Sequence, residues 1–98
     1  MRRVVFRTQA DRELAEATQW YKDRDLRVAV HFVETVERVL QAIQSNPFQY
    51  QVIEGDIHRV PLRRFPYKIV YQVTNTELII LSCFHSARDP QALRGHIP

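Results

Sequence analysis

The sequence predicts an α+β domain in which a pair of helices covers one face of a mostly antiparallel sheet. One observation is that apolar residues recur at helical spacing through two segments between residues 8 and 46. Another is that polar and apolar residues alternate through shorter segments, which is typical of strands with one buried face. The expected order is β-α-α-β-β-β, and the length of 98 residues fits a single domain over residues 1–98.

Composition excludes several classes of protein. Hydrophobic residues make up 45% of the chain and charged residues 26%, which is ordinary for a globular domain. With only two glycines the chain has no glycine-rich phosphate loop, and its single cysteine, Cys83, excludes an internal disulfide and a cysteine-based metal cluster. No apolar run approaches the ~20 residues that span a bilayer, and the N-terminal apolar run is too short for a signal peptide. We therefore expect a cytoplasmic protein without membrane contact.

The first strand and the first helix are expected at the N-terminus. Residues 3–7 are β-branched and aromatic at their centre, which favours a strand. Thr8 is expected to cap the following helix, with Asp11 near the positive end of its dipole. The apolar stripe of this helix consists of Ala10, Leu14, Ala17 and Tyr21.

A second helix follows a charged connector, and either Asp23 or Asp25 is expected to cap it. Its β-branched valines lower the intrinsic helix propensity, so burial must stabilise it. Pro47 disfavours helical backbone in the residue before it, which ends the helix near Asn46. The expected apolar face consists of Val28, Ala29, Phe32, Val33, Val36, Val39, Leu40 and Ile43.

The remaining strands lie in the second half of the chain. A short extended piece is expected at residues 50–53, and residues 58–73 predict two strands joined by a tight connection. Residues 77–85 are almost continuously apolar, which predicts a strand buried on both faces. One helical turn is expected after Pro90. Alternation places His58, Val60, Leu62, Tyr67, Ile69, Tyr71 and Val73 on the helix-covered face of the strand pair, and Arg59, Pro61, Arg63 and Lys68 on the open face.

Charge is unevenly distributed along the chain. Residues 1–56 carry eight basic and nine acidic side chains, whereas residues 57–98 carry six basic and two acidic ones. The basic half is where we expect a polyanion or an acidic protein partner. A solvated face without a partner explains the composition equally well.

The ordered set of these features resembles the RelE/ParE superfamily of bacterial toxins. The resemblance rests on the basic strand, on residues 65–73, on the apolar strand that leads into residues 85–90, and on the two N-terminal helices. It covers nearly the whole chain and implies the toxin of a type II toxin–antitoxin pair, neutralised by a small antitoxin encoded beside it. One fold carries two activities in this superfamily, so the fold does not decide the function.

RelE-type members cleave mRNA in the ribosome, and this sequence meets their pattern only in part. Arg59 falls at the first basic position, whereas Pro61 replaces an expected lysine. Lys68 stands where arginine is usual, and Leu93 stands near the place of a catalytic tyrosine. If the chain is RelE-like, its catalytic residues are expected together on the open face of the sheet. These candidates are Arg59, Lys68, His85 and Arg88.

RNA cleavage by 2′-hydroxyl attack needs a base, an acid, and cations for the developing phosphate charge. Among the expected positions only His85 titrates near neutral pH. The incomplete match to the RelE-type pattern therefore favours a ParE-like toxin that binds and inhibits DNA gyrase. The alternative is a metal-independent endoribonuclease that acts on mRNA at the ribosome. A degenerate member that only binds its antitoxin is a third alternative. No cofactor is expected, and no metal, because His31, His58 and His96 share no ligand spacing.

Several of these residues also have a purely structural interpretation. The cations expected to contact the antitoxin or the target are Arg59, Arg63, Arg64, Lys68, Arg88 and Arg94. We favour antitoxin contact over direct substrate contact for the sheet cations, although solvated side chains fit the same pattern. A histidine hydrogen-bonded to backbone is the favoured interpretation of His85. Tyr67 and Tyr71 are expected in the core, and Cys83 is expected as a small buried hydrophobe.

Overall fold

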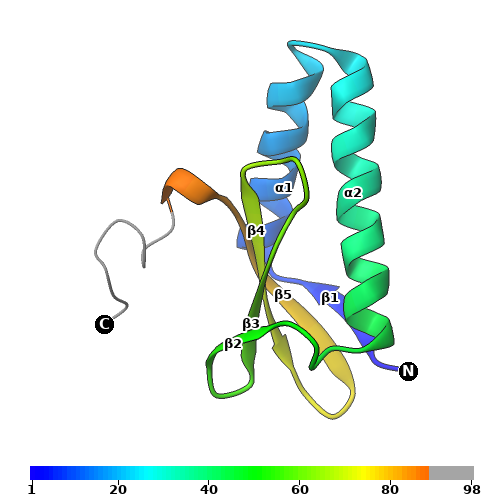
Figure 1. Ribbon diagram of the computed structural model, residues 1–98, viewed down its shortest axis with the longest axis vertical. Coiled ribbons are helices and arrows are strands. Elements are labelled where there is room, and N and C mark those ends of the chain that lie inside the picture. The colour runs from blue at the N-terminus through cyan, green and yellow to red at the C-terminus, as the bar shows by residue number, and fades with distance from the viewer. Residues whose placement is uncertain (89–98) are drawn as a thin grey trace.

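The computed structural model describes residues 1–88, which form two helices and a five-stranded sheet (Figure 1). The strand order is β1-β5-β4-β3-β2; β1 pairs with β5 in parallel, and the other pairs are antiparallel. This confirms the predicted α+β fold, and the expected extended piece forms a strand of its own, β2. The elements are β1 (Arg3–Phe6), α1 (Thr8–Lys22), α2 (Leu26–Ser45), β2 (Gln51–Glu54), β3 (Ile57–Pro61), β4 (Tyr67–Val73), β5 (Glu77–His85) and the 3₁₀ turn η1 (Ser86–Arg88).

The two helices begin in different ways. Asp25 caps α2, because its Oδ1 accepts the backbone N–H of Arg27 at 2.9 Å. The predicted cap of α1 is wrong: Thr8 is already helical, and Arg7 stands at the N-cap without a side-chain cap hydrogen bond. Asp11 does lie in the first turn of α1, where its charge faces the positive end of the dipole.

The core lies between the helical hairpin and one face of the sheet. Burial of each large apolar side chain there contributes about 1.5–3 kcal/mol. The alternation predicted for β3 and β4 is confirmed, since every second residue of these strands is turned toward the helices. The buried core residues are Ala10, Ala17, Ala29, Phe32, Val36, Ile43, Val60, Leu62, Ile69, Tyr71, Val73, Leu78, Ile80 and Cys83.

His58 is a buried polar residue in this core. Its Nδ1 lies 3.0 Å from the carbonyl oxygen of Tyr50, and its ring stacks on Tyr71 with centroids 5.2 Å apart. The Tyr71 hydroxyl donates to the carbonyl of Pro47 at 2.7 Å. These two side chains therefore fasten the connection between α2 and β2 onto the sheet.

The apolar face of α2 is narrower than the sequence predicts. Val28 and Val33 belong to the predicted core face, yet each is 37% exposed. Leu26 and Val30 are more exposed still, at 64% and 49%. The reason is that α1 and the sheet cover only one side of α2, so Leu26, Val30 and Val33 form a second apolar stripe on its outer side.

The prediction that β5 is buried on both faces is also wrong. Leu78, Ile80 and Cys83 face the helices, whereas the residues between them are only half buried, because the helices cover a single face. A register shift against β4 leaves Leu81 between the paired residues Ile80 and Ser82. This bulge returns Cys83 to the core face.

Candidate functional site

Two of the predicted site cations lie together on the sheet face that the helices leave open. Arg59 of β3 pairs with Val70 of β4, and Lys68 of β4 pairs with Pro61 of β3. Arg59 and Lys68 are therefore diagonal neighbours on one face, a placement that separates two residues by about 7–8 Å or less. Both are half buried, and Arg59 Nη2 donates to Gln51 Oε1 on β2 at 3.2 Å.

The rest of the open face is mainly apolar and half buried. Phe84 pairs with Lys68, so an aromatic ring borders the cations on the β5 side. At the opposite end of the face Arg3 and Glu77 form a cross-strand ion pair at 2.7 Å. The open face is thus cationic at one end and neutralised at the other. Its half-buried apolar residues include Val5, Ile57, Val70, Ile79 and Phe84.

His85 lies on the other face. It pairs with Tyr67, which shares the helix-covered face of β4 with Ile69 and Tyr71, and the two rings are 5.2 Å apart. The expectation that His85 joins Arg59 and Lys68 on the open face is therefore wrong. His85 Nδ1 accepts the backbone N–H of Ala87 at 3.1 Å, which requires that nitrogen to be unprotonated. His85 is therefore hydrogen-bonded to the backbone, as its structural interpretation predicts.

Tyr67 joins His85 to an aromatic cluster beneath the helical hairpin. The Tyr67 ring lies 5.4 Å from Phe32 and 6.4 Å from Tyr21, and Phe65 lies 5.3 Å from each of those two rings. Such aromatic pairs each contribute about 0.5–1.5 kcal/mol beyond burial. The surroundings of His85 are therefore those of a structural residue.

The β3–β4 loop carries two further predicted cations at its tip. Leu62 is buried and Phe65 is half buried, so the side chains on either side of Arg63 and Arg64 point inward. Arg63 and Arg64 are exposed, and the backbone of Arg64 has a φ of 69°, in the left-handed region. The sequence gives no sign of this conformation, because arginine is not a residue that favours it.

The predicted C-terminal residues fall largely outside the described part of the chain. Arg88 ends η1, but only its backbone is described. Arg94, Leu93 and the helical turn expected after Pro90 lie outside the described residues.

Cys83 is confirmed as a buried hydrophobe rather than a nucleophile. Burial, and secondly the nearby Glu13 carboxylate, raise the pKa of its thiol to about 12, so the thiol stays protonated near neutral pH. Glu13 Oε1 accepts the Ser82 hydroxyl at 2.8 Å and the backbone N–H of Cys83 at 3.0 Å. β1 pairs with β5 only as far as Ile80, so beyond that residue the Glu13 carboxylate accepts a backbone N–H of β5 that β1 does not reach.

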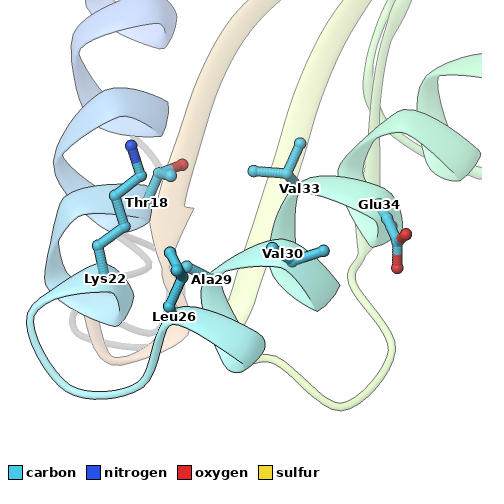
Figure 2. Close-up of a pocket in the computed structure, with 7 residues that line it drawn as sticks. All are labelled: Thr18, Lys22, Leu26, Ala29, Val30, Val33 and Glu34. Carbon is cyan, nitrogen blue, oxygen red and sulfur yellow. The ribbon is translucent and has the colours of Figure 1, made fainter.

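An apolar groove on the outer side of the helical hairpin was not predicted. It has a volume of about 200 Å³, and its apolar wall is formed by Leu26, Val30 and Val33 of α2 (Figure 2). The spacing i, i+4, i+7 of these residues is the sequence signal that could have found it. The lining residues are Thr18, Lys22, Leu26, Ala29, Val30, Val33 and Glu34.

Two further properties concern the described residues as a whole. Among residues 1–88, no group of three or more His, Cys, Asp or Glu side chains is arranged to hold a metal ion. Neither helix in this part of the chain combines the length and the apolar character needed to cross a membrane.

A comparison with family models gives a match over most of the chain. The model of the ParE toxin of the type II toxin–antitoxin system parDE matches residues 4–90. A search of curated protein sequences finds no significant match.

Several solved structures have a similar fold. A chain of the chromosomal ParDE system from P. aeruginosa superposes with a TM-score of 0.73 at 17% identity, over 87% of this chain and 96% of that chain. A chain of the intact E. coli RelBE complex gives 0.64 at 18% identity, over 87% and 96%. A chain of the E. coli DinJ–YafQ complex gives 0.67 at 11% identity, over 92% and 99%. At identities this low, these superpositions establish a shared fold and nothing more.

Proposed function

Because the chain belongs to the ParE toxin family of type II toxin–antitoxin systems, we propose that it inhibits DNA gyrase by binding and is neutralised by a cognate antitoxin. The observation that carries the choice of gyrase is the separation of His85 from Arg59 and Lys68 across the sheet. Nuclease chemistry needs an acid or base and cations that converge on one phosphate. A toxin that acts by binding needs no such convergence.

An mRNA endonuclease that acts in the ribosome is the second candidate. It is favoured by the diagonal placement of Arg59 and Lys68 beside Phe84 on the open face. Cations beside a half-buried aromatic ring suit single-stranded RNA, whose phosphates and bases they contact. This candidate needs an acid or base other than His85 on the open face.

The antitoxin partner is supported by the apolar groove of the helical hairpin. The groove offers three partly exposed apolar side chains in a row, Leu26, Val30 and Val33, which fits the apolar face of an amphipathic helix. Lys22 lies on the α1 side of the groove and Glu34 on the α2 side (Figure 2). Opposite charges on the two sides favour one orientation of the bound helix.

Controlled expression without antitoxin, followed by parallel assays, tests the proposal. A gyrase inhibitor stops plasmid supercoiling and produces filamentous cells while translation continues. Cleaved mRNA and arrested translation with normal supercoiling would instead establish the endonuclease. Normal growth at full expression would establish a degenerate member that only binds its antitoxin.

A further inference from the structure

Arg64 adopts a backbone conformation that arginine rarely adopts. Its φ of 69° lies in the left-handed region, where the Cβ atom crowds the next carbonyl oxygen and glycine is the usual residue. The β2–β3 turn of this same chain uses glycine there: Gly55 has a φ of 54°. A Cβ atom at Gly55 would meet nothing within 4 Å, so that position is open as well as left-handed. The chain thus keeps a side chain at Arg64 where the backbone favours none.

The loop that carries Arg64 is fixed at both ends. The backbone N–H of Leu62 donates to the carbonyl of Tyr67 at 2.9 Å, and that of Ser86 donates to the carbonyl of Pro66 at 2.7 Å. Leu62 is buried, and the Phe65 ring packs against the rings of Tyr21 and Phe32. The loop between β3 and β4 therefore lies beside the helical hairpin (Figure 1). A loop fixed in this way can bind a partner without the cost of ordering its backbone.

The two arginines at the tip are unpaired within the described part of the chain. Arg63 and Arg64 are exposed, and neither guanidinium has a hydrogen-bond or ion-pair partner among residues 1–88. The hairpin over residues 57–73 carries four basic side chains and no carboxylate. An acidic partner is therefore complementary in charge to this hairpin.

We propose that Arg63 and Arg64 are the contact by which this toxin docks onto an acidic segment of its protein target, and that the left-handed backbone at Arg64 is retained for this contact. The target is gyrase, so the inference rests on the proposed function. A guanidinium binds a carboxylate through two parallel N–H donors, and the fixed loop sets the position of the backbone that carries it. Glycine would relieve the backbone but would remove one of the two guanidinium groups.

A protein segment suits this loop better than nucleic acid. Tight binding of duplex DNA draws on about 6–10 phosphate contacts. The loop tip offers two cations, and the next two, Arg59 and Lys68, lie half buried on the open sheet face. Two adjacent guanidinium groups match a short acidic segment of a folded protein.

The test compares full-length variants in binding to purified gyrase holoenzyme, in inhibition of supercoiling, and in thermal unfolding. Arg64→Gly is expected to raise Tm by about 4–8 °C, the shift for relief of a single strained residue in a domain of this size. The same variant is expected to weaken gyrase binding at least about tenfold. Arg64→Lys keeps the charge without the planar guanidinium, so its affinity for gyrase should fall between those of wild type and Arg64→Gly. Arg38→Gln, an exposed cation of α2, is the matched control and should change neither property.

Each other outcome overturns the inference in a recognisable way. Wild-type affinity for gyrase in Arg64→Gly shows that the loop is not the contact. An equal loss of binding to a short DNA duplex alone would assign the arginines to nucleic acid, and loss of the complex with the antitoxin would assign them to that partner. If the wild-type protein itself does not bind gyrase, the proposed function fails and the inference fails with it. Because Arg64→Gly is expected to be the more stable protein, unfolding does not explain its loss of binding.

Discussion

Lys68 and His85 lie on opposite faces of the sheet although they are almost adjacent across two strands. Lys68 pairs with Phe84, and His85 is the next residue along β5, where it pairs with Tyr67. Successive side chains of a strand point to opposite faces, so one step of register separates the cation from the imidazole. This relationship supports our proposal of a toxin that acts by binding over one that acts as a nuclease.

The first prediction concerns His85 itself. His85→Ala removes the acceptor of the Ala87 N–H and one aromatic contact, so it should lower the free energy of unfolding by about 1 kcal/mol. It should leave growth arrest largely intact, because gyrase inhibition needs no base at this position. Growth after induced expression measures the effect, with circular dichroism as the control for folding. Near-complete loss of toxicity in a folded variant would show that His85 takes part in chemistry.

Tyr71 makes a buried hydrogen bond that should appear in the pH dependence of stability. Burial, with a smaller contribution from Tyr50, raises the pKa of its hydroxyl from 10.0 to about 12. The unfolded chain therefore loses this proton first, so the contribution of Tyr71 is complete below pH 10 and declines as the pH rises toward 12.

Tyr71→Phe is the variant that isolates this effect. It leaves the Pro47 carbonyl without its donor and should lower the free energy of unfolding by about 1–3 kcal/mol near neutral pH. The difference between wild type and Tyr71→Phe, from urea unfolding at several pH values, should narrow between pH 10 and 12. A constant difference over that range would show that Tyr71 titrates as it does in the unfolded chain.

Glu13 is expected to stabilise the edge of β5 that β1 leaves uncovered. Glu13→Ala removes the acceptor shared by the Ser82 hydroxyl and the Cys83 N–H, which should lower the free energy of unfolding by about 1–3 kcal/mol. Glu16→Ala is the matched control, because Glu16 is an exposed carboxylate on the same helix. Equal unfolding free energies for the two variants would mean that the Glu13 contacts contribute nothing net.

The helical groove leads to a prediction about antitoxin binding. Val30→Glu places a charge in the apolar groove and should weaken the complex with the antitoxin at least about tenfold. The variant should still arrest growth, and co-expressed antitoxin should no longer restore it. Val28→Glu is the control, since Val28 is an exposed valine of α2 outside the groove lining. Titration calorimetry measures the affinity, and equal binding by both variants would place the antitoxin elsewhere.

Strands whose polar and apolar residues alternate could be assigned to a face of the sheet from the sequence, whereas a continuous apolar strand could not. Alternation through residues 58–62 correctly separated His58, Val60 and Leu62 from Arg59. The face of His85 was missed because β5 reads as a continuous apolar run, in which neither the face nor the bulge at Leu81 is visible. The face of His85 and the bulge at Leu81 are both set by the pairing of β5 with β4. This pairing depends on the folded sheet and not on the sequence of β5 alone.

The candidate site was predicted less completely than the fold. Val33 was assigned to the core because helical periodicity gives the width of an apolar stripe but not how much of it other elements cover. The left-handed backbone of Arg64 follows from the geometry of the β3–β4 loop, whose anchors Leu62 and Phe65 act from the two ends. A turn that holds arginine in place of glycine has no local signature in the sequence.

Supercoiling of relaxed plasmid by purified gyrase holoenzyme, as full-length wild-type protein is titrated into the reaction, tests the central claim most directly. We predict that supercoiling is lost as the toxin is added and that His85→Ala inhibits as well as wild type. Undiminished supercoiling at a molar excess of a protein that arrests growth would contradict the account.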